Sequence, residues 1–273
     1  MVKIKTAAGL LFVSVMSLIG SASTQAALID RGNGLIYDTV LDVTWAQDLD
    51  LSRTFTGVGI FNWRGAKAWA DQLVYQGYDD WRLPTLTPIN GVKFNRIFHC
   101  DGSADYGYGI AAPGGKSAGF TGNELAYMYH VNLGNKSQCT GEGPYLAGKQ
   151  WGPNVGVQNA SFVDALTHET VSFLHLQDTK NLFWFDLAPP PSDFTWAFKY
   201  NGFNDWAAAF QRGRAWAVRD GDVFAACTGL ICASAAATFV ASVPEPSTLL
   251  LLFGLIPSLG FLRKRKRARQ SFA

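Results

Sequence analysis

Asp79-Asp80-Trp81-Arg82-Leu83-Pro84 is the stretch that most strongly indicates how this chain folds, and Trp216-Ala217-Val218-Arg219 follows a similar order much further along. Large aromatic side chains dominate the cores of small domains, so both tryptophans are predicted to be buried. The two arginines are expected to hydrogen-bond loop carbonyls or to pair with a carboxylate of Asp79, Asp80 or Asp220. Pro84 is expected to start a strand.

Alternation of apolar and polar residues predicts strands on both sides of this stretch. Two short strands are predicted within residues 30–38 and 41–45. Four more are predicted further along, over residues 170–176, 182–186, 195–200 and 214–219. The three prolines at 189–191 must form a connection, because proline cannot serve the interior of a sheet.

Two helices are predicted between these strands. Asn62 can cap the first, over residues 63–75, and Gly77 is expected to end it. The second spans residues 123–133 and is stopped by Gly134. Residues 85–122 and 135–160 show no sustained period and are predicted to be long loops. Two helices with a mostly antiparallel set of strands indicate an α+β fold class, in one domain over residues 27–232.

The N-terminal residues 1–26 have the pattern of a secretory signal peptide. Lys3 and Lys5 precede an apolar run, and Thr24 and Ala26 are the small residues expected before the cleavage site. A retained anchor helix is the alternative, although the run is shorter than the roughly 20 residues that span a bilayer. Small residues at 233–242 form a linker after the domain.

The C-terminal segment, residues 243–273, combines three features in order. Pro244-Glu245-Pro246 comes first, the apolar run 249–262 follows, and a basic cluster at 263–267 ends it. The run is predicted to form a short transmembrane helix whose basic flank stays cytoplasmic. This order resembles the PEP-CTERM sorting signal of Gram-negative bacteria.

The resemblance implies recognition by an exosortase and cleavage near Pro244-Glu245-Pro246. A transient membrane anchor would then give way to release or attachment at the cell surface, commonly in species that make exopolysaccharide. A plain C-terminal tail anchor is the alternative. Neither possibility says what the preceding domain does.

The net charge of the chain is +2, but the charges are unevenly placed. Eight of the 23 Lys and Arg residues and one of the 21 acidic residues lie in the terminal segments. Residues 27–243 therefore carry 15 basic and 20 acidic residues, a net charge of −5. A nucleic-acid-binding domain needs basic residues clustered on its folded surface, so the chain is predicted not to bind nucleic acid.

All four cysteines lie in the exported part, where an even number favours disulfides. Three pairings are possible. Pairing Cys100 with Cys139 and Cys227 with Cys232 is preferred, since the first ties down a glycine-rich stretch and the second closes a short local loop. A zinc site is the alternative, but no pair has the Cys-x2-Cys spacing. No metal or cofactor is expected.

Several phrases in a fixed order produce a second resemblance. They begin with Asp30-Arg31-Gly32-Asn33-Gly34 and continue with residues 77–85, 124–135 and 215–221. In this order they resemble the Lcl C-terminal-domain-like family of bacterial surface proteins, over about residues 30–222. The resemblance implies a C-type-lectin-like α+β fold and, for the best-known type of the family, binding of sulfated glycans and adhesion in biofilms. The chain departs from the family pattern at residues 86–88 and 183–185.

Carbohydrate binding requires aromatic faces for stacking and polar groups for hydroxyls. Six residues in segments predicted to be loops are candidates for glycan binding: Tyr106, Tyr108, Trp151, Asn204, Asp205 and Trp206. The alternative is that each packs beneath a long loop. The phrase Phe203-Asn204-Asp205 resembles part of the calcium site of C-type lectins, but its partner Glu-Pro-Asn phrase is missing. The charge of −5 favours a neutral or weakly charged polysaccharide over a strongly sulfated one.

No catalytic motif stands out. The four histidines, at 99, 130, 168 and 175, are scattered without a His-Glu-x-x-His phrase, and no Gly-x-Ser-x-Gly elbow is present. The chain is therefore predicted to be a non-catalytic cell-surface or matrix protein that binds exopolysaccharide or mediates adhesion. An exopolysaccharide-modifying hydrolase and a structural coat protein without a specific ligand are the alternatives.

Overall fold

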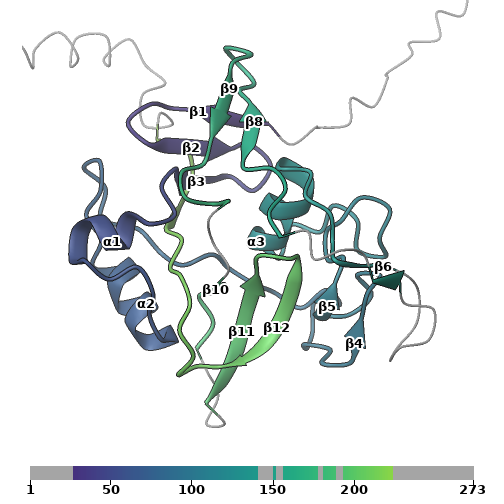
Figure 1. Ribbon diagram of the computed structural model, residues 1–273. Coiled ribbons are helices and arrows are strands. Elements are labelled where there is room, and N and C mark those ends of the chain that lie inside the picture. The colour runs from purple at the N-terminus through teal and green to yellow at the C-terminus, as the bar shows by residue number, and fades with distance from the viewer. Residues whose placement is uncertain (1–26, 141–149, 152–155, 178–180, 189–192, 224–273) are drawn as a thin grey trace, which may run out of the picture. The chain divides into compact units, whose positions relative to one another are not determined.

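The segment around Trp81 lies against a four-stranded antiparallel sheet that joins the two ends of the described chain (Figure 1). The order of its strands is β1 (Leu28–Asp30), β2 (Leu35–Asp38), β3 (Val43–Ala46) and β13 (Val218–Asp220). Arg82 and Val218 exchange backbone hydrogen bonds of 2.8 and 3.0 Å. The segment thereby extends the sheet beyond β13.

A five-stranded sheet forms the second layer. The computed structural model describes residues 27–140, 150–151, 156–177, 181–188 and 193–223, all within one compact unit. The strand order is β10 (Leu182–Trp184), β11 (Phe194–Lys199), β12 (Phe203–Ala208), β5 (Tyr106–Tyr108) and β4 (Phe98–His99). Only the β4–β5 pair of this sheet is parallel.

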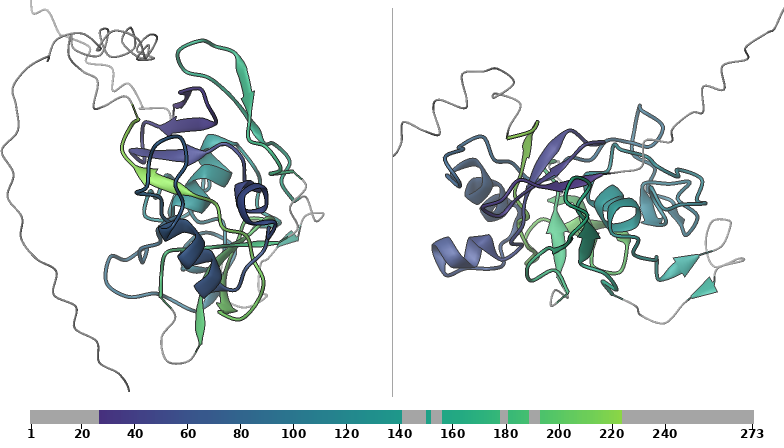
Figure 2. Two further views of the ribbon diagram at one scale, coloured as in Figure 1. Left: turned by 90° about the vertical axis from the view of Figure 1, so that its left-hand side faces the viewer. Right: turned by 90° about the horizontal axis from the view of Figure 1, so that it is seen from above.

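Two small hairpin-like pairs complete the described strands. β6 (Cys139–Thr140) pairs with β7 (Gln150–Trp151), and β8 (Ser161–Val163) pairs with β9 (Thr170–Ser172), both antiparallel. The β8–β9 pair projects beside β1, as the views in Figures 1 and 2 show. β9 covers only the first three residues of the strand that was predicted over residues 170–176.

The helices begin at residues that the sequence predicts but end earlier. Asn62 caps α2 (Trp63–Asp71) by accepting a 2.8 Å hydrogen bond from the Gly65 amide, and the helix ends four residues before the predicted position. Asn123 caps α3 (Glu124–Tyr127), which continues as the π-helix η1 (Met128–Asn132). A third short helix, α1 (Leu51–Thr56), is absent from the sequence-based prediction.

The core contains both tryptophans of the opening motifs. Trp81 is 2% exposed and Trp216 is 3% exposed, which confirms their predicted burial. Trp216 packs against Trp45 with ring centroids 4.7 Å apart, and its indole donates to the Ala46 carbonyl at 2.8 Å. The indole hydrogen bond matters because an unsatisfied buried N–H is costly.

The arginines of the two motifs form ion pairs. Arg82 makes two 2.9 Å hydrogen bonds to the Glu124 carboxylate and also pairs with Asp220. Arg219 contacts both carboxylate oxygens of Asp80 at 2.7 Å, and this pairing lowers the pKa of Asp80. Pairing with Asp220 and Asp80 was predicted from the sequence, but Glu124 was not.

Three predictions of loop structure are wrong. The stretch 85–122 contains β4 and β5, the stretch 135–160 contains β6 and β7, and residues 203–208 form β12, which the sequence analysis did not predict. The first four of these strands have only two or three residues each, too few for a readable alternation. The described residues nevertheless contain few helices and several antiparallel sheets, which agrees with the α+β class.

Candidate functional site

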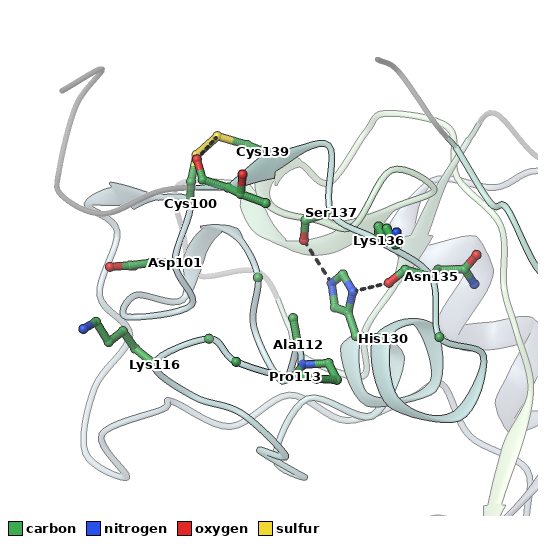
Figure 3. Close-up of a pocket in the computed structure, with 15 residues that line it drawn as sticks. Cys100, Asp101, Ala112, Pro113, Lys116, His130, Asn135, Lys136, Ser137 and Cys139 are labelled. Carbon is green, nitrogen blue, oxygen red and sulfur yellow. Dashed lines mark hydrogen bonds between the residues drawn. A yellow bond between two sulfur atoms is a disulfide. The ribbon is translucent and has the colours of Figure 1, made fainter. Parts of the chain in front are cut away.

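A disulfide between Cys100 and Cys139 borders a cavity in the described part of the chain, as Figure 3 shows. The bond confirms one of the two predicted pairings. The cavity has a volume of about 590 Å³. Its walls come from four segments: residues 100–101, residues 109–116, His130 of η1, and residues 134–140.

The glycine-rich wall of the cavity, residues 109–116, depends on a close approach of its backbone to residues 101–102. The Gly102 amide donates to the Tyr108 carbonyl at 3.0 Å, and the Lys116 amide donates to the Asp101 carbonyl at 2.7 Å. A Cβ atom on Gly102 would lie 2.4 Å from the Gly109 carbonyl oxygen, and its φ is +76°. Glycine is therefore required there.

His130 forms the inner wall of the cavity. Its ring is 2% exposed, and burial lowers its pKa to about 4. The imidazole is consequently neutral at pH 7. Nδ1 lies 2.9 Å from the Asn135 carbonyl oxygen, so Nδ1 carries the proton and donates it, since a carbonyl can only accept.

The remaining ring nitrogen points toward Ser137. Nε2 lies 3.4 Å from the Ser137 hydroxyl oxygen, and Figure 3 shows the imidazole between the serine and the Asn135 oxygen, with a hydrogen bond to each. Because Nδ1 holds the proton, Nε2 is an acceptor and the hydroxyl donates to it.

Asn135 is held rigidly by a neighbouring segment. Its side-chain oxygen accepts from the amides of Gln158 and Asn159 at 2.8 and 2.7 Å, and its side-chain nitrogen donates to the Asn159 carbonyl at 2.8 Å. The Asn135 amide also donates to the Tyr129 carbonyl at 2.9 Å. The Asn135 carbonyl, which accepts the hydrogen bond from His130 Nδ1, is therefore fixed in its orientation.

Three of the predicted glycan-binding residues share one face of the five-stranded sheet. Tyr106, Tyr108 and Asp205 lie on the side of Phe203, because Phe203 pairs with Tyr108 in the register. Tyr108 stacks on Phe203 with centroids 4.8 Å apart, and it is only 6% exposed. Asp205 pairs with Lys199 at 2.8 Å.

The other predicted residues lie elsewhere. Asn204 is fully buried on the opposite face, where it donates to the Asp105 carbonyl. Trp206 packs on that face against Trp196, and the Arg96 guanidinium lies 4.7 Å from its ring centroid. Trp151 lies in β7, where its backbone pairs with Cys139 of β6. The five residues whose side chains the structure describes therefore lie on two faces of one sheet.

Several predicted features lie outside the described residues. They are the signal peptide, Cys227 and Cys232, the motif Pro244-Glu245-Pro246 and the apolar run 249–262. Among the residues that are described, no helix is long and apolar enough to cross a membrane. In the same part of the chain, no cluster of three or more His, Cys, Asp or Glu residues is placed to hold a metal ion.

The sequence analysis overlooked His130, Asn135 and Ser137 as a unit. Their closeness in sequence, within eight residues after a capped helix, was a signal that could have found them. What it could not show is the direction of the imidazole, which depends on the π-helical turn of η1. π-helical turns are frequent at functional sites.

Comparison with known proteins places the C-terminal segment in a defined class of sorted proteins. Residues 242–266 match the family described as PEP-CTERM protein-sorting motif. The motif implies an exosortase as processing partner, with export and C-terminal membrane anchoring before cleavage. No curated protein and no solved structure matches the chain significantly.

Proposed function

We propose that this surface-sorted protein binds a carbohydrate in the cavity beside the Cys100–Cys139 disulfide. The observation that carries the proposal is the cavity itself, whose 590 Å³ lies within the range of small-molecule sites. Its walls present hydroxyl, carboxylate and ammonium groups, from Ser137, Asp101 and two lysines. Such groups match the hydroxyls of a sugar.

The sequence resemblance supports the same proposal. The motifs around Trp81 and Trp216 resemble the Lcl C-terminal-domain-like family, for which a C-type-lectin-like fold and glycan binding are implied. The ion pairs of Arg82 and Arg219 give both motifs a structural role in this chain. Binding is therefore assigned to the cavity and not to the motifs.

The charge of the protein limits which class of polysaccharide can bind. The cavity lining has Lys116 and Lys136 but also Asp101, and residues 27–243 have a net charge of −5. A densely sulfated polymer would be repelled by the acidic body as a whole. A neutral or weakly anionic exopolysaccharide fits both the mixed charges of the cavity and the negative charge of the domain. Such binding would let the protein adhere within a polysaccharide matrix.

The test uses the full-length chain purified in mild detergent and the exopolysaccharide of the producing cells. Ala112 lines the cavity, so Ala112→Trp is expected to fill it and weaken binding about tenfold or more. Ala118→Trp changes an exposed residue outside the lining and should bind like the wild type. Equal binding by both variants, or no saturable binding to any polysaccharide, would refute the proposal. The second result would favour a coat protein without a specific ligand.

A further inference from the structure

We propose that Ser137 and His130 form an esterase site in this cavity, with an O-acylated carbohydrate as the substrate class. This inference rests on the proposed function for the identity of the substrate. The ester-cleaving chemistry itself rests on the arrangement of the side chains. It departs from the expectation of a non-catalytic protein.

The arrangement has the three parts that activate a serine. A hydroxyl, an imidazole and an acceptor for the far ring nitrogen follow one another, at 3.4 Å and 2.9 Å. The acceptor is the Asn135 carbonyl, which takes the place of the carboxylate of the common triad. Hydrogen bonds between nucleophile and base are often long without substrate and tighten when it binds.

The imidazole is fixed in this direction from several sides. Tyr129 lies edge-on to it at 4.7 Å between centroids, and Phe198 lies at 6.5 Å. A Cβ atom on Gly202 would approach the ring to 3.0 Å, so no larger residue fits there without displacing it. The base is therefore preorganised, which reduces the entropic cost of reaching the reactive geometry.

Each proton has a defined path in the reaction. Ser137 Oγ attacks the acyl carbon of the ester and transfers its proton to His130 Nε2. The bond between the acyl carbon and the sugar oxygen then breaks, and the proton on Nε2 passes to that oxygen, which leaves as a hydroxyl. Water attacks the acyl-serine through the same base, and the carboxylic acid and free Ser137 are regenerated.

An ester is favoured over a glycosidic bond by the carboxylates available. Glycosidases use two carboxylates on either side of the bond that is cleaved. Among the described residues that line the cavity there is one, Asp101. A serine with an imidazole base instead matches acyl transfer, and O-acyl groups are ester substituents of carbohydrates.

A second serine and histidine pair provides a matched control. Ser103 Oγ lies 2.8 Å from His99 Nδ1, but it also donates to Asp101 Oδ1 at 2.6 Å. The carboxylate therefore holds the hydroxyl itself and does not orient the far side of the imidazole. This pair should not activate its serine.

The experiment treats the full-length chain with a fluorophosphonate probe and measures hydrolysis of p-nitrophenyl acetate. Mass spectrometry is expected to find the adduct on Ser137, and Ser137→Ala should lower the hydrolysis rate about a hundredfold or more. Ser103→Ala should leave both results unchanged. An unlabelled Ser137, or a Ser137→Ala rate equal to the wild type, would overturn the inference.

Release of acetate from acetylated exopolysaccharide then tests the substrate class. Loss of release in Ser137→Ala supports it, and hydrolysis of the small ester without any acetate release from the polymer overturns the carbohydrate assignment. The two proposals fail separately. Retained polysaccharide binding by an inactive wild type refutes only the esterase, whereas an active esterase that binds no polysaccharide refutes the proposed function and the carbohydrate substrate but leaves the ester-cleaving site standing.

Discussion

Acidification from pH 7 to pH 5 should weaken the fold through His130. The buried imidazole has a pKa of about 4 in the folded protein, against 6.5 for an exposed histidine. Between these values the unfolded chain binds a proton that the folded chain does not. The free energy of unfolding therefore falls as the pH falls through this window, and it is fully retained only above about 6.5.

The loss of unfolding free energy depends on how many pH units are crossed below 6.5. Each pH unit in which only the unfolded state is protonated costs about 1.4 kcal/mol. From 6.5 down to 5 the loss amounts to about 2 kcal/mol. The variant His130→Asn removes the titrating group and places an amide nitrogen near the position of Nδ1, so its loss over the same range should be smaller by about 2 kcal/mol.

Urea unfolding of both proteins at pH 7 and pH 5 measures this difference. Carboxylates with shifted pKa values, such as Asp105 and Asp80, are common to both proteins and largely cancel in the comparison. Equal pH dependence of the two proteins would contradict the reasoning. If the variant does not fold, an NMR titration of the wild-type ring decides instead, because a midpoint near 6.5 would show that burial does not depress the pKa.

Three further changes have expected effects on stability. Glu124→Gln breaks the bidentate ion pair with Arg82, whose side chains are 7% and 18% exposed, and should cost about 3 kcal/mol in urea unfolding. Replacing Cys100 and Cys139 with alanine opens a crosslink of sequence separation 39 and should cost about 4 kcal/mol, measured against the oxidised wild type. Gly107→Ala would place a Cβ atom 1.8 Å from the His99 carbonyl oxygen at a φ of +137°, so thermal unfolding should show a loss of at least about 2 kcal/mol.

Each of these predictions has its own control or contrary result. Asp80→Asn breaks an ion pair whose carboxylate is 53% exposed, and it should cost only about 1 kcal/mol or less. Reducing agent should destabilise the wild type by about 4 kcal/mol more than the double alanine variant, which keeps only Cys227 and Cys232. Gly119→Ala has a positive φ but open space around the new Cβ, so it should cost about 1 kcal/mol. If Gly107→Ala costs no more stability than Gly119→Ala, the close approach of β4 and β5 does not exclude a side chain at residue 107, and the prediction is wrong.

Local signals in the sequence predicted much of the fold. Asn62 caps a helix as expected, since a cap depends on only three or four neighbouring residues, and the second helix begins where it was predicted, with Asn123 as its cap. The alternation near Tyr37 and Thr44 correctly predicted β2 and β3. Trp206 was wrongly predicted to lie in a loop, because the pattern of β12 becomes clear only when β11 and β5 are seen on either side of it.

The candidate site was less accessible to prediction. Ser137 and His130 are close in sequence, but the direction of the imidazole depends on Gly202 and Phe198, which lie in and just after β11, much further along the chain. Likewise, the Arg82 carboxylate partner lies 42 residues away at Glu124. Pairings of this kind depend on how the chain returns on itself, and no local pattern encodes them.

The sequence by itself determined that this protein carries a sorting motif, which implies export, because such a motif is recognised as a short linear segment and needs no surrounding fold. It also determined the helix cap at Asn62 and the burial of Trp81 and Trp216, which follow from local chemistry and from side-chain size. The tertiary structure alone decided that a serine, a neutral imidazole and a carbonyl line one cavity. Burial and long-range packing set the pKa and the orientation of His130, and both arise only when distant segments come together.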